Sequence, residues 1–309
     1  MKIMILGGTA FMGPLVAKCL KEQGHNITLF HRTKSQNQAF AEMQGDCNSP
    51  DDLRKAIETF QPDTIIHMVA MYQSHVEVLE KALSGRKIRI LIVSSADVYK
   101  GFEIFNKLSD SPVEAVPFTE ESPLRDVRFP YRGVPGIDIG YYYDKILVEQ
   151  AALRSPLLDT VIARLGMVYG RNDPNRRFKD IVRRINRGDN TIEIHEKAAA
   201  LKTCKCYAEN VAHGIALASQ KGAAGEIYNI ADKEVLSELE WYRTVAGLMN
   251  WGGKFLMTSA DDNFELAKTA NLDQHLMLDS TKIRKELGFA EIVPLEAGLR
   301  KTIEWESRM

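Results

Sequence analysis

The feature that most constrains this chain is its opening segment, in which an apolar run leads directly into a glycine-rich turn. Ile3–Leu6 has the continuous apolar character of a buried strand, and the amphipathic residues 14–24 predict a helix that ends at a glycine. A second apolar run at Ile27–Phe30 predicts the next strand. Strand, helix and strand within about 30 residues form the βαβ unit of α/β proteins.

The small residues of the turn point to a phosphate-binding site. Gly7 permits a tight turn, while Gly8 and Ala10 let backbone N–H groups approach a ligand. Gly13 lets the helix pack closely, and the positive end of the helix dipole then faces the turn. The pyrophosphate of a dinucleotide is the anion that best suits this arrangement. The residues predicted to contact the dinucleotide here are Gly7, Thr9, Ala10, Phe11, Met12 and Gly13.

Strand and helix patterns continue to alternate through the first half of the chain. Uninterrupted apolar strands are typical of a parallel sheet that helices cover on both faces. We therefore predict a Rossmann-type, doubly wound α/β domain over residues 1–170, with a strand near 226–231 beside it. Residues 171–309 are expected to form a smaller α+β lobe for the substrate. Further strands are expected at Thr64–Met68, Ile88–Val93 and Thr160–Leu165, and helices at Asp51–Phe60, Gln73–Leu83, Tyr141–Arg154, Leu236–Met249 and Pro294–Glu306.

Composition narrows the class of protein. The 309 residues carry a net charge of −1, with 45% hydrophobic and 26% charged side chains, as in ordinary soluble globular proteins. The net charge is too small to create an electrostatic field that would attract nucleic acid, and no apolar run is long enough to span a bilayer. The sequence enters a strand at once, so we expect no signal peptide, and its four cysteines are too few for a disulfide scaffold. We expect a reducing, cytoplasmic location, with Cys204 and Cys206 packed on one side of a strand.

Six motif-like segments follow one another along the chain, namely Gly7–Gly13, Gly45–Asp46, Pro62–Ala70, Val93–Tyr99, Tyr141–Lys145 and Arg164–Gly170. In this order they resemble the motifs of the extended short-chain dehydrogenase/reductase family, which contains the NAD-dependent epimerases and dehydratases of nucleotide sugars. An alanine at the middle glycine of the first motif, and a short connection after the third, resemble the atypical branch of that family. The resemblance implies an NAD(P)-dependent oxidoreductase that acts at a hydroxyl or keto carbon of a sugar nucleotide or a related small molecule.

The resemblance also implies a catalytic set of Ser95, Tyr141 and Lys145. Tyr142 and Tyr143 adjoin the first tyrosine, but only Tyr141 stands four residues before the lysine. That spacing would place Tyr141 and Lys145 on one face of a helix, where the lysine charge favours the phenolate. Tyr141 would then take a proton from a substrate hydroxyl that Ser95 hydrogen-bonds, and Lys145 would hold the cofactor ribose.

Two further polar residues lie close to these motifs. Asp97 is two residues beyond Ser95, on the same side of an extended chain. Dehydratases of the family have an acid there that helps to remove an α-proton, and the alternative is a hydrogen-bonded loop carboxylate. His67 falls within a strand pattern and is expected to be a packed core residue rather than a catalyst.

The residues after the second strand bear on the choice of cofactor. An acid there binds the ribose 2′-hydroxyl of NAD, whereas this chain has His31, Arg32, Thr33 and Lys34. The guanidinium of Arg32 suits a 2′-phosphate, and we therefore expect NADP(H) in preference to NAD(H), with contacts from His31, Arg32 and Lys34. The resemblance implies further cofactor contacts at Asp46, Val69 and Ala70.

Alternatives remain open for the function. One is an NADPH-dependent reductase on the same fold, and another is a non-catalytic relative that senses a cofactor or binds RNA. The basic stretch Arg176–Arg187 is either a phosphate or RNA site or the solvated face of an amphipathic helix. The family's phosphate-binding arginine before Tyr207 is not evident, although Lys202 and Lys205 lie nearby. We expect a small-molecule substrate, no membrane or nucleic-acid partner, and a monomer or homodimer.

Overall fold

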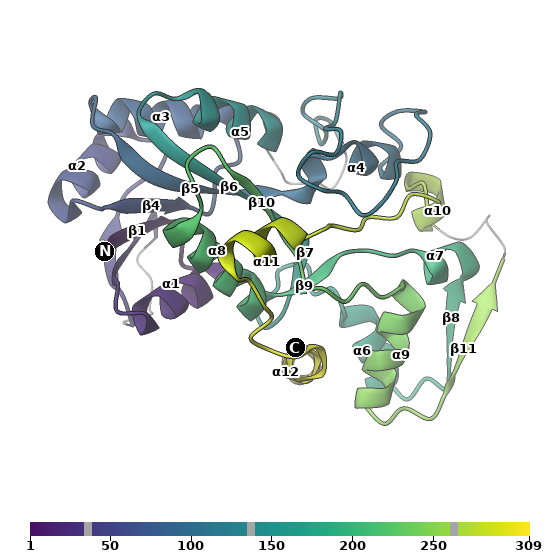
Figure 1. The fold of residues 1–309 in the computed structure, drawn as a ribbon. Helices are drawn as coiled ribbons and strands as arrows, with labels where there is room; N and C mark the ends of the chain where they lie inside the picture. Colours follow the sequence, from purple (N-terminus) through teal and green to yellow (C-terminus); the bar gives the residue numbers. More distant parts are fainter. Residues whose placement is uncertain (34–38, 135–139, 260–264) are drawn as a thin grey trace.

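The centre of the molecule is a seven-stranded parallel β-sheet (Figure 1). The computed structural model describes residues 1–33, 39–134, 140–259 and 265–309. The strands lie in the order β3-β2-β1-β4-β5-β6-β10, and β1 pairs with both β2 and β4. The strand order therefore reverses beside β1, the place where sheets of this kind bind ligands. The strands are β1 Lys2–Leu6, β2 Asn26–His31, β3 Ala41–Gln44, β4 Thr64–His67, β5 Ile88–Ser95, β6 Leu158–Leu165 and β10 Ile227–Ile230.

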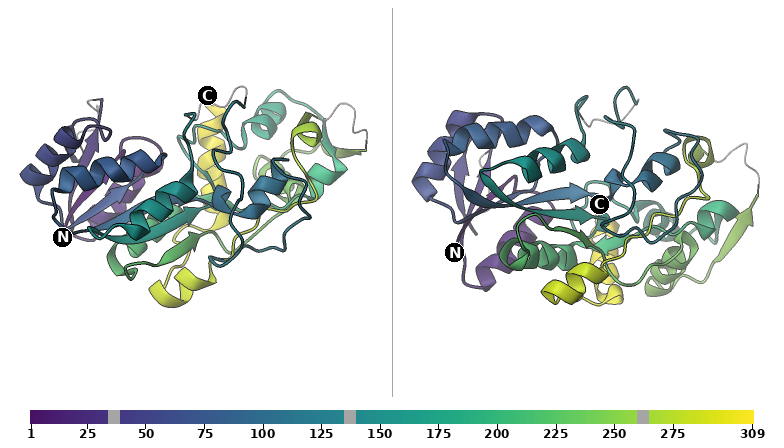
Figure 2. Two further views of the ribbon diagram at one scale, coloured as in Figure 1. Left: turned by 90° about the horizontal axis from the view of Figure 1, so that it is seen from above. Right: turned by 45° about the horizontal axis from the view of Figure 1, so that its top comes forward.

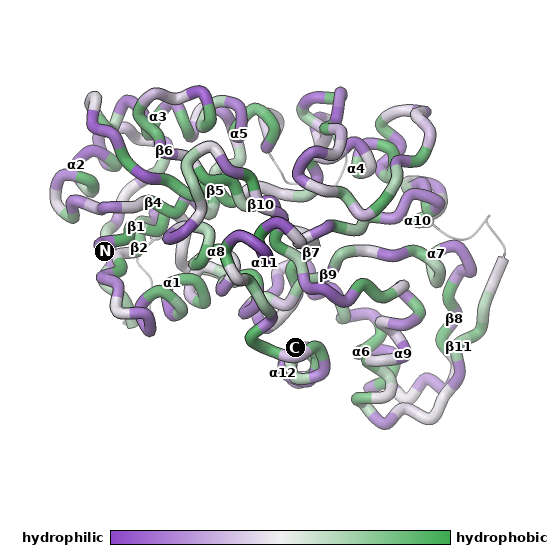
Figure 3. The backbone as a smooth tube through the Cα atoms, in the orientation of Figure 1, coloured by the Kyte–Doolittle hydropathy of each residue, from purple (hydrophilic) through white to green (hydrophobic). Residues whose placement is uncertain are grey.

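Helices cover both faces of this sheet because its strands are apolar on both sides. In β1, Ile3 and Ile5 pack into the core beneath α1 and α8, whereas Met4 and Leu6 pack into the core beneath α2, α3 and α5. Figure 3 shows hydrophobic residues along the central strands and hydrophilic residues in the outer turns. The covering helices are α1 Met12–Glu22 and α8 Ala208–Lys221 on one face, and α2 Pro50–Phe60, α3 Gln73–Leu83 and α5 Lys145–Arg154 on the other, with α11 Thr281–Leu287 against α8 and β10.

A smaller assembly lies at one end of the sheet (Figure 2). Its core is aromatic, with Tyr169, Phe178 and Trp241 in edge or tilted ring contacts. Two short parallel ribbons, β7 with β9 and β8 with β11, complete it. Its elements are β7 Met167–Tyr169, α6 Lys179–Asn186, β8 Thr191–His195, α7 Glu196–Ala200, β9 Lys205–Tyr207, α9 Glu238–Leu248, β11 Lys254–Thr258, α10 Glu265–Thr269 and α12 Leu295–Ser307; η1 Ala96–Val98 and α4 Lys100–Phe105 follow β5.

The sequence prediction of a parallel Rossmann-type sheet is confirmed. The Ser49 hydroxyl caps α2 by accepting the Asp52 N–H at 3.2 Å, because serine before proline suits a helix start. Most predicted boundaries differ from the observed ones by one or two residues, and the largest error is at the helix expected from Tyr141, which begins at Lys145. The sequence analysis also missed the short edge strand β3 and the long helix α8, and β10 pairs directly with β6.

The four cysteines are free thiols. Cys204 and Cys206 are both buried on one side of the chain, and their Sγ atoms lie 3.5 Å apart, which agrees with the predicted packing role. In the described parts of the chain, no helix is both long enough and apolar enough to span a membrane.

Candidate active site

The turn after β1 has a geometry that lets a ligand approach its backbone closely. Gly7 adopts φ +80°, a conformation that side chains disfavour. A Cβ atom on Gly13 would lie 2.4 Å from the carbonyl carbon of Gly8, so only glycine fits there. The residue before α1, Phe11, makes no side-chain cap hydrogen bond. The first N–H groups of α1 are therefore left without a side-chain acceptor, as a bound phosphate requires.

A cavity of about 490 Å³ opens over this turn, at the carboxyl ends of β1, β2 and β4. Its glycine floor leaves room for a dinucleotide, which supports the predicted cofactor site. Of the predicted contacts, those that line the cavity are Gly7, Thr9, Ala10, His31, Arg32 and Val69. The sequence analysis missed Phe30, Thr33, Gly45, Cys47, Asn48, Met71, Tyr72 and His75. The predicted contacts Phe11, Asp46 and Ala70 adjoin lining residues in the sequence, whereas Met12 and Gly13 begin α1 just beyond the turn. Lys34 lies outside the described residues.

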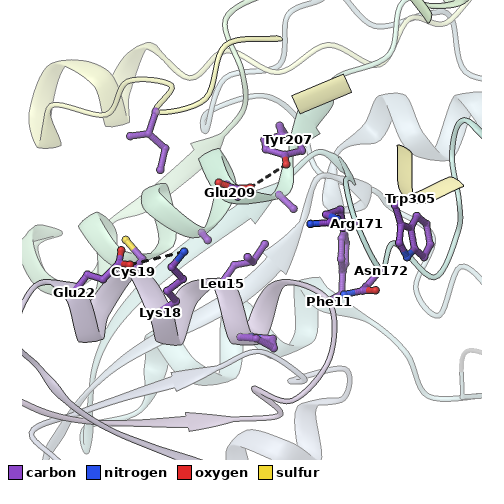
Figure 4. Close-up of a pocket in the computed structure, with 14 residues that line it drawn as sticks. Phe11, Leu15, Lys18, Cys19, Glu22, Arg171, Asn172, Tyr207, Glu209 and Trp305 are labelled. Carbon is purple, nitrogen blue, oxygen red and sulfur yellow. Dashed lines mark hydrogen bonds and ion pairs between the residues drawn. The ribbon is translucent and has the colours of Figure 1, made fainter. Parts of the chain in front are cut away.

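The Phe11 side chain belongs to a different cavity, of about 560 Å³, between α1 and the start of α8 (Figure 4). Figure 4 shows Phe11, Arg171 and Trp305 at one end of it, and Lys18 with Glu22 at the other. The Lys18 ammonium lies 3.8 Å from the Glu22 carboxylate. A contact between Phe11 and the dinucleotide would therefore involve the backbone of this residue.

An acid that the sequence patterns did not indicate lies near His31, at the end of β2. Glu42 on β3 lies beside the end of β2, with its Oε2 atom 3.3 Å from His31 Nε2. The short strand β3 was not predicted, so no sequence pattern gave a reason to place Glu42 beside β2. Asp46 follows β3, and hydrogen bonds from the Asn48 backbone and side chain lower the pKa of its carboxyl. Arg32 is close enough to Asp46 to lower this pKa further.

A second cluster lies where β5 ends, at Ser95. The Ser95 hydroxyl accepts the backbone N–H of Asp97 at 3.2 Å and so begins η1. The side chain of Asp97 is buried, and its Oδ2 atom accepts the hydroxyls of Tyr143 at 2.6 Å and Tyr131 at 3.2 Å. Within the described residues, Oδ1 of Asp97 has no hydrogen-bond partner. The cluster thus contains a buried carboxylate that holds two phenols and retains one unused acceptor oxygen.

Burial changes the acidity of these groups. Burial raises the pKa of the Asp97 carboxyl, although Arg125, the two phenols and Lys145 oppose this effect. Burial and the neighbouring Asp97 raise the pKa of Tyr143 well above its ordinary value. In the resting site the phenol protons therefore remain on the tyrosines, and the carboxylate accepts hydrogen bonds from both.

Lys145 is the first residue of α5 and is almost completely buried. Asp144 caps this helix by accepting the Ile146 N–H at 3.0 Å. The Lys145 ammonium donates to the carbonyl oxygens of Ala70 at 2.8 Å and Val93 at 3.0 Å. Burial lowers the pKa of Lys145 to about 8. The two carbonyl contacts place the ammonium between the end of β5 and the residues that follow β4.

Tyr141 does not share a helix face with Lys145, because α5 begins only at the lysine. Its side chain is 58% exposed, and its ring lies 4.2 Å from the guanidinium carbon of Arg132. Tyr143, by contrast, is 6% exposed and bonded to Asp97. The capping carboxylate of Asp144 was the sequence signal for the true helix start, and it would have drawn attention to Tyr143.

His67 is completely buried at the end of β4, the position expected of a packed core histidine. Its ring meets that of His75 edge-on, with the centroids 5.7 Å apart. Burial, together with His75 and Lys145, lowers the pKa of His67 well below its ordinary value. The imidazole is therefore neutral near neutral pH.

Three of the basic residues considered for a substrate phosphate are engaged within the protein. Lys205 is buried and pairs with Glu238. Arg176 pairs with Glu306, with 2.7 Å between the charged atoms, and Arg177 donates to the Val168 carbonyl at 2.9 Å. These cations therefore stabilise the smaller assembly rather than present a bare basic face.

Three features define a dinucleotide-binding protein of the Rossmann class. They are a parallel sheet with a glycine turn after β1, a cavity of suitable size where the strand order reverses, and a cluster of Ser, Tyr and Lys beyond β5. The model of the NAD-dependent epimerase/dehydratase family matches residues 3–231, and the chain belongs to that family.

Known relatives of the chain are enzymes. In an alignment of 339 positions, the chain is 22% identical to dTDP-glucose 4,6-dehydratase of Salmonella typhimurium. The alignment covers 99% of this chain and 92% of that protein. The chain is 24% identical over 285 residues to a trifunctional UDP-glucose 4,6-dehydratase, 3,5-epimerase and reductase of Arabidopsis thaliana. The matched region covers 86% of this chain but only 39% of the plant protein. Among solved structures, UDP-glucuronic acid 4-epimerase of Bacillus cereus, in complex with UDP-glucuronic acid and NAD, has a TM-score of 0.73 at 16% identity, covering 100% of this chain and 99% of that one.

Proposed function

We propose that the protein is an NAD(P)-dependent oxidoreductase of the epimerase or dehydratase type. Its substrate class is a nucleotide sugar or a related small molecule, and its reacting carbon carries a hydroxyl or keto group. The observation that carries the proposal is the 2.6 Å hydrogen bond from Tyr143 to Asp97, next to Ser95 and the buried Lys145. The family membership and the names of the relatives support the substrate class.

A bound nicotinamide dinucleotide supplies a reversible two-electron acceptor for this chemistry. The Ser95 hydroxyl donates to the substrate oxygen and positions it. Tyr143 accepts the proton of the substrate hydroxyl on its phenolic oxygen, while its own proton passes along the existing hydrogen bond to Oδ2 of Asp97. The ammonium of Lys145 stabilises the negative charge that develops in this cluster. In this account Tyr143 replaces Tyr141 as the proton acceptor, because Tyr143 already has the carboxylate partner that a weakly acidic phenol needs.

We also propose that the cavity selects NADP(H) through Arg32. Arg32 lines the cavity after β2, and the acid nearest that strand end, Glu42, is paired with His31. A guanidinium there favours a 2′-phosphate by charge and by paired hydrogen bonds. The opposing consideration is that the structural relative named above contains NAD.

Two further features of the proposal concern the protein in the cell. The four free thiols support a reducing, cytoplasmic location, which subcellular fractionation would check. We expect a monomer or a homodimer, and light scattering on the purified protein would distinguish these states.

Three matched tyrosine variants test the assignment of the proton acceptor. Tyr143→Phe removes the phenol that contacts Asp97, and we expect turnover to fall by roughly 10²–10⁴-fold while cofactor affinity is kept. Tyr141→Phe and Tyr142→Phe change exposed phenols and are expected to retain activity. The assay is product formation from a panel of nucleoside diphosphate sugars, followed by NMR, together with nicotinamide fluorescence for cofactor binding.

Each outcome of this experiment has a distinct meaning. Full activity of Tyr143→Phe with loss in Tyr141→Phe would reverse the assignment in favour of the spacing-based prediction. Product formation without net change in the nicotinamide absorbance supports an epimerase or dehydratase, whereas stoichiometric consumption of NADPH supports a reductase. A protein that binds no nicotinamide cofactor would contradict the proposed function as a whole.

A further inference from the structure

Tyr131 is a second phenol on the same carboxylate, and the sequence motifs give no indication of it. It lies in the long connection between α4 and α5, and its hydroxyl is 3.2 Å from Oδ2 of Asp97. Its ring contacts that of Tyr143, with the centroids 5.2 Å apart and a tilt of 52° between the planes. One carboxylate oxygen therefore accepts hydrogen bonds from two phenols, which belong to two different segments of the chain.

The segment that contains Tyr131 is fixed to both elements of the site. Arg125 is 1% exposed; it donates to the backbone carbonyl of Asp97 and pairs with Asp144 at 3.2 Å. Asp144 also accepts the N–H of Phe129 at 2.8 Å while it caps α5. The position of Tyr131 is thus set by contacts to η1 on one side and to the start of α5 on the other. Such a phenol is held in place before any substrate arrives.

The charged and titratable groups around Asp97 come from every neighbouring element. Arg125 and Tyr131 face it from the connecting segment, Tyr143 from the residues before α5, and Lys145 from α5 itself. Of these, the two phenols are the groups that hydrogen-bond the carboxylate side chain. Asp144 partly neutralises Arg125, and Glu149 lies close enough to Lys145 to affect its proton affinity. Removing one phenol therefore changes the hydrogen bonding of Asp97 without removing a formal charge.

We propose that Tyr131 is a positioning residue of the active site, which shares Oδ2 of Asp97 with Tyr143 and thereby keeps the carboxylate ionised and its Oδ1 atom available. This inference rests on the proposed function, because it assigns the proton-accepting role to the Asp97–Tyr143 pair. A hydrogen bond to the ionised form of a carboxyl makes that form more stable. Without Tyr131, Asp97 holds a proton up to a higher pH, and Tyr143 loses its acceptor over that range.

The first test does not depend on substrate. We would compare the urea unfolding of the parent protein with that of Tyr131→Phe across the acidic pH range, with Tyr142→Phe as the matched exposed control. The stability lost in Tyr131→Phe is expected to be largest near neutral pH and to shrink as the pH falls, because protonated Asp97 no longer gains from the bond. The Tyr142→Phe difference is expected to stay small and constant. A Tyr131→Phe difference that is equally constant across pH would overturn the inference.

The second test uses turnover. In Tyr131→Phe the acidic limb of the kcat profile is expected to move to higher pH by roughly one unit, with KM and cofactor affinity nearly unchanged. An unshifted limb alongside an inactive Tyr143→Phe refutes the role of Tyr131 and leaves the proposed function intact. If Tyr143→Phe is fully active, the assignment of Tyr143 as the proton acceptor fails, and the unfolding comparison still decides whether Tyr131 stabilises the ionised carboxylate.

Discussion

Arg164 and Glu149 face each other in the interior of the protein and form two parallel hydrogen bonds, from Nε to Oε1 at 3.0 Å and from a terminal nitrogen to Oε2 at 2.7 Å. Both side chains are almost completely buried, and the pair ties β6 to α5. Ser94 donates to the same carboxylate at 2.5 Å, and Arg164 also donates to the hydroxyl of Tyr99 at 3.1 Å. The helix that begins with Lys145 is thus anchored to the sheet by a fully hydrogen-bonded ion pair.

Breaking this buried pair is expected to be costly. Arg164→Met leaves Glu149 as an uncompensated buried carboxylate, so the free energy of unfolding is expected to fall by about 3–5 kcal/mol. The control is Arg308→Met, which breaks the exposed pair with Glu304 and is expected to cost at most about 1 kcal/mol. Urea unfolding followed by circular dichroism measures both. Equal losses in the two variants would show that the interior pair contributes no more than a surface one.

Gly13 is predicted to tolerate no side chain. In Gly13→Ala the new Cβ meets the backbone of Gly8, so α1 or the turn must shift by more than a side chain can absorb. We expect a loss of stability of roughly 1–3 kcal/mol and a cofactor Kd at least about tenfold higher. Gly247→Ala, in α9, is the matched control, because nothing lies within 4 Å of the added carbon and the protein is expected to gain about 0.5–1 kcal/mol. Unchanged cofactor binding in Gly13→Ala would contradict the proposed phosphate turn.

The buried Lys145 makes stability depend on pH on the alkaline side. Burial lowers its pKa from 10.5 to about 8, so between these values the unfolded chain binds more protons than the folded one. The free energy of unfolding, taken relative to Lys145→Met, is therefore expected to rise by roughly 3 kcal/mol as the pH increases from 8 to 10.5, and to be flat below 8. Denaturant unfolding of both proteins at several pH values measures this difference. A difference that does not change with pH would mean that the lysine keeps its ordinary pKa.

Arg32 is predicted to determine the choice of dinucleotide. Arg32→Ser removes the cation that faces the ribose end of the cavity, and we expect the Kd for NADPH to rise about tenfold or more, while the Kd for NADH changes little. Arg171→Ser is the control, since Arg171 lines the separate cavity between α1 and the start of α8. Calorimetric titration of the three proteins gives the ratios. Equal increases in the Kd for NADPH and for NADH would mean that Arg32 does not contact the 2′-phosphate of the ribose.

Local patterns allowed most of the sheet to be predicted, because each strand and helix of the first half has its own apolar periodicity. Gln73–Leu83 was predicted with the observed bounds. Ala41–Gln44 was missed since it is a short strand at the sheet edge with no buried residue to mark its face. Ala208–Lys221 was missed for the opposite reason, because most of its residues are buried and few positions mark a solvent-facing side.

The site was predictable only in part, because spacing along the chain does not determine which side chains meet. The strand-end Ser95 and the helical Lys145 follow from the motifs. Tyr143 and Tyr131 reach Asp97 only because the preceding segment folds back and the helix starts later than its residue pattern indicates. A motif that counts four residues from tyrosine to lysine selects the exposed phenol and passes over the buried one.

The position of β10 has a consequence for how this protein is made. On the side away from β5, β6 pairs with β10 Ile227–Ile230, and β7, α6, β8, α7, β9 and α8 lie between the two strands in sequence. While the ribosome synthesises those elements, β6 remains an open edge whose N–H and C=O groups can pair with another chain. The last strand of the sheet is added only after those elements have emerged, so the nascent chain passes through a long interval in which premature pairing competes with folding.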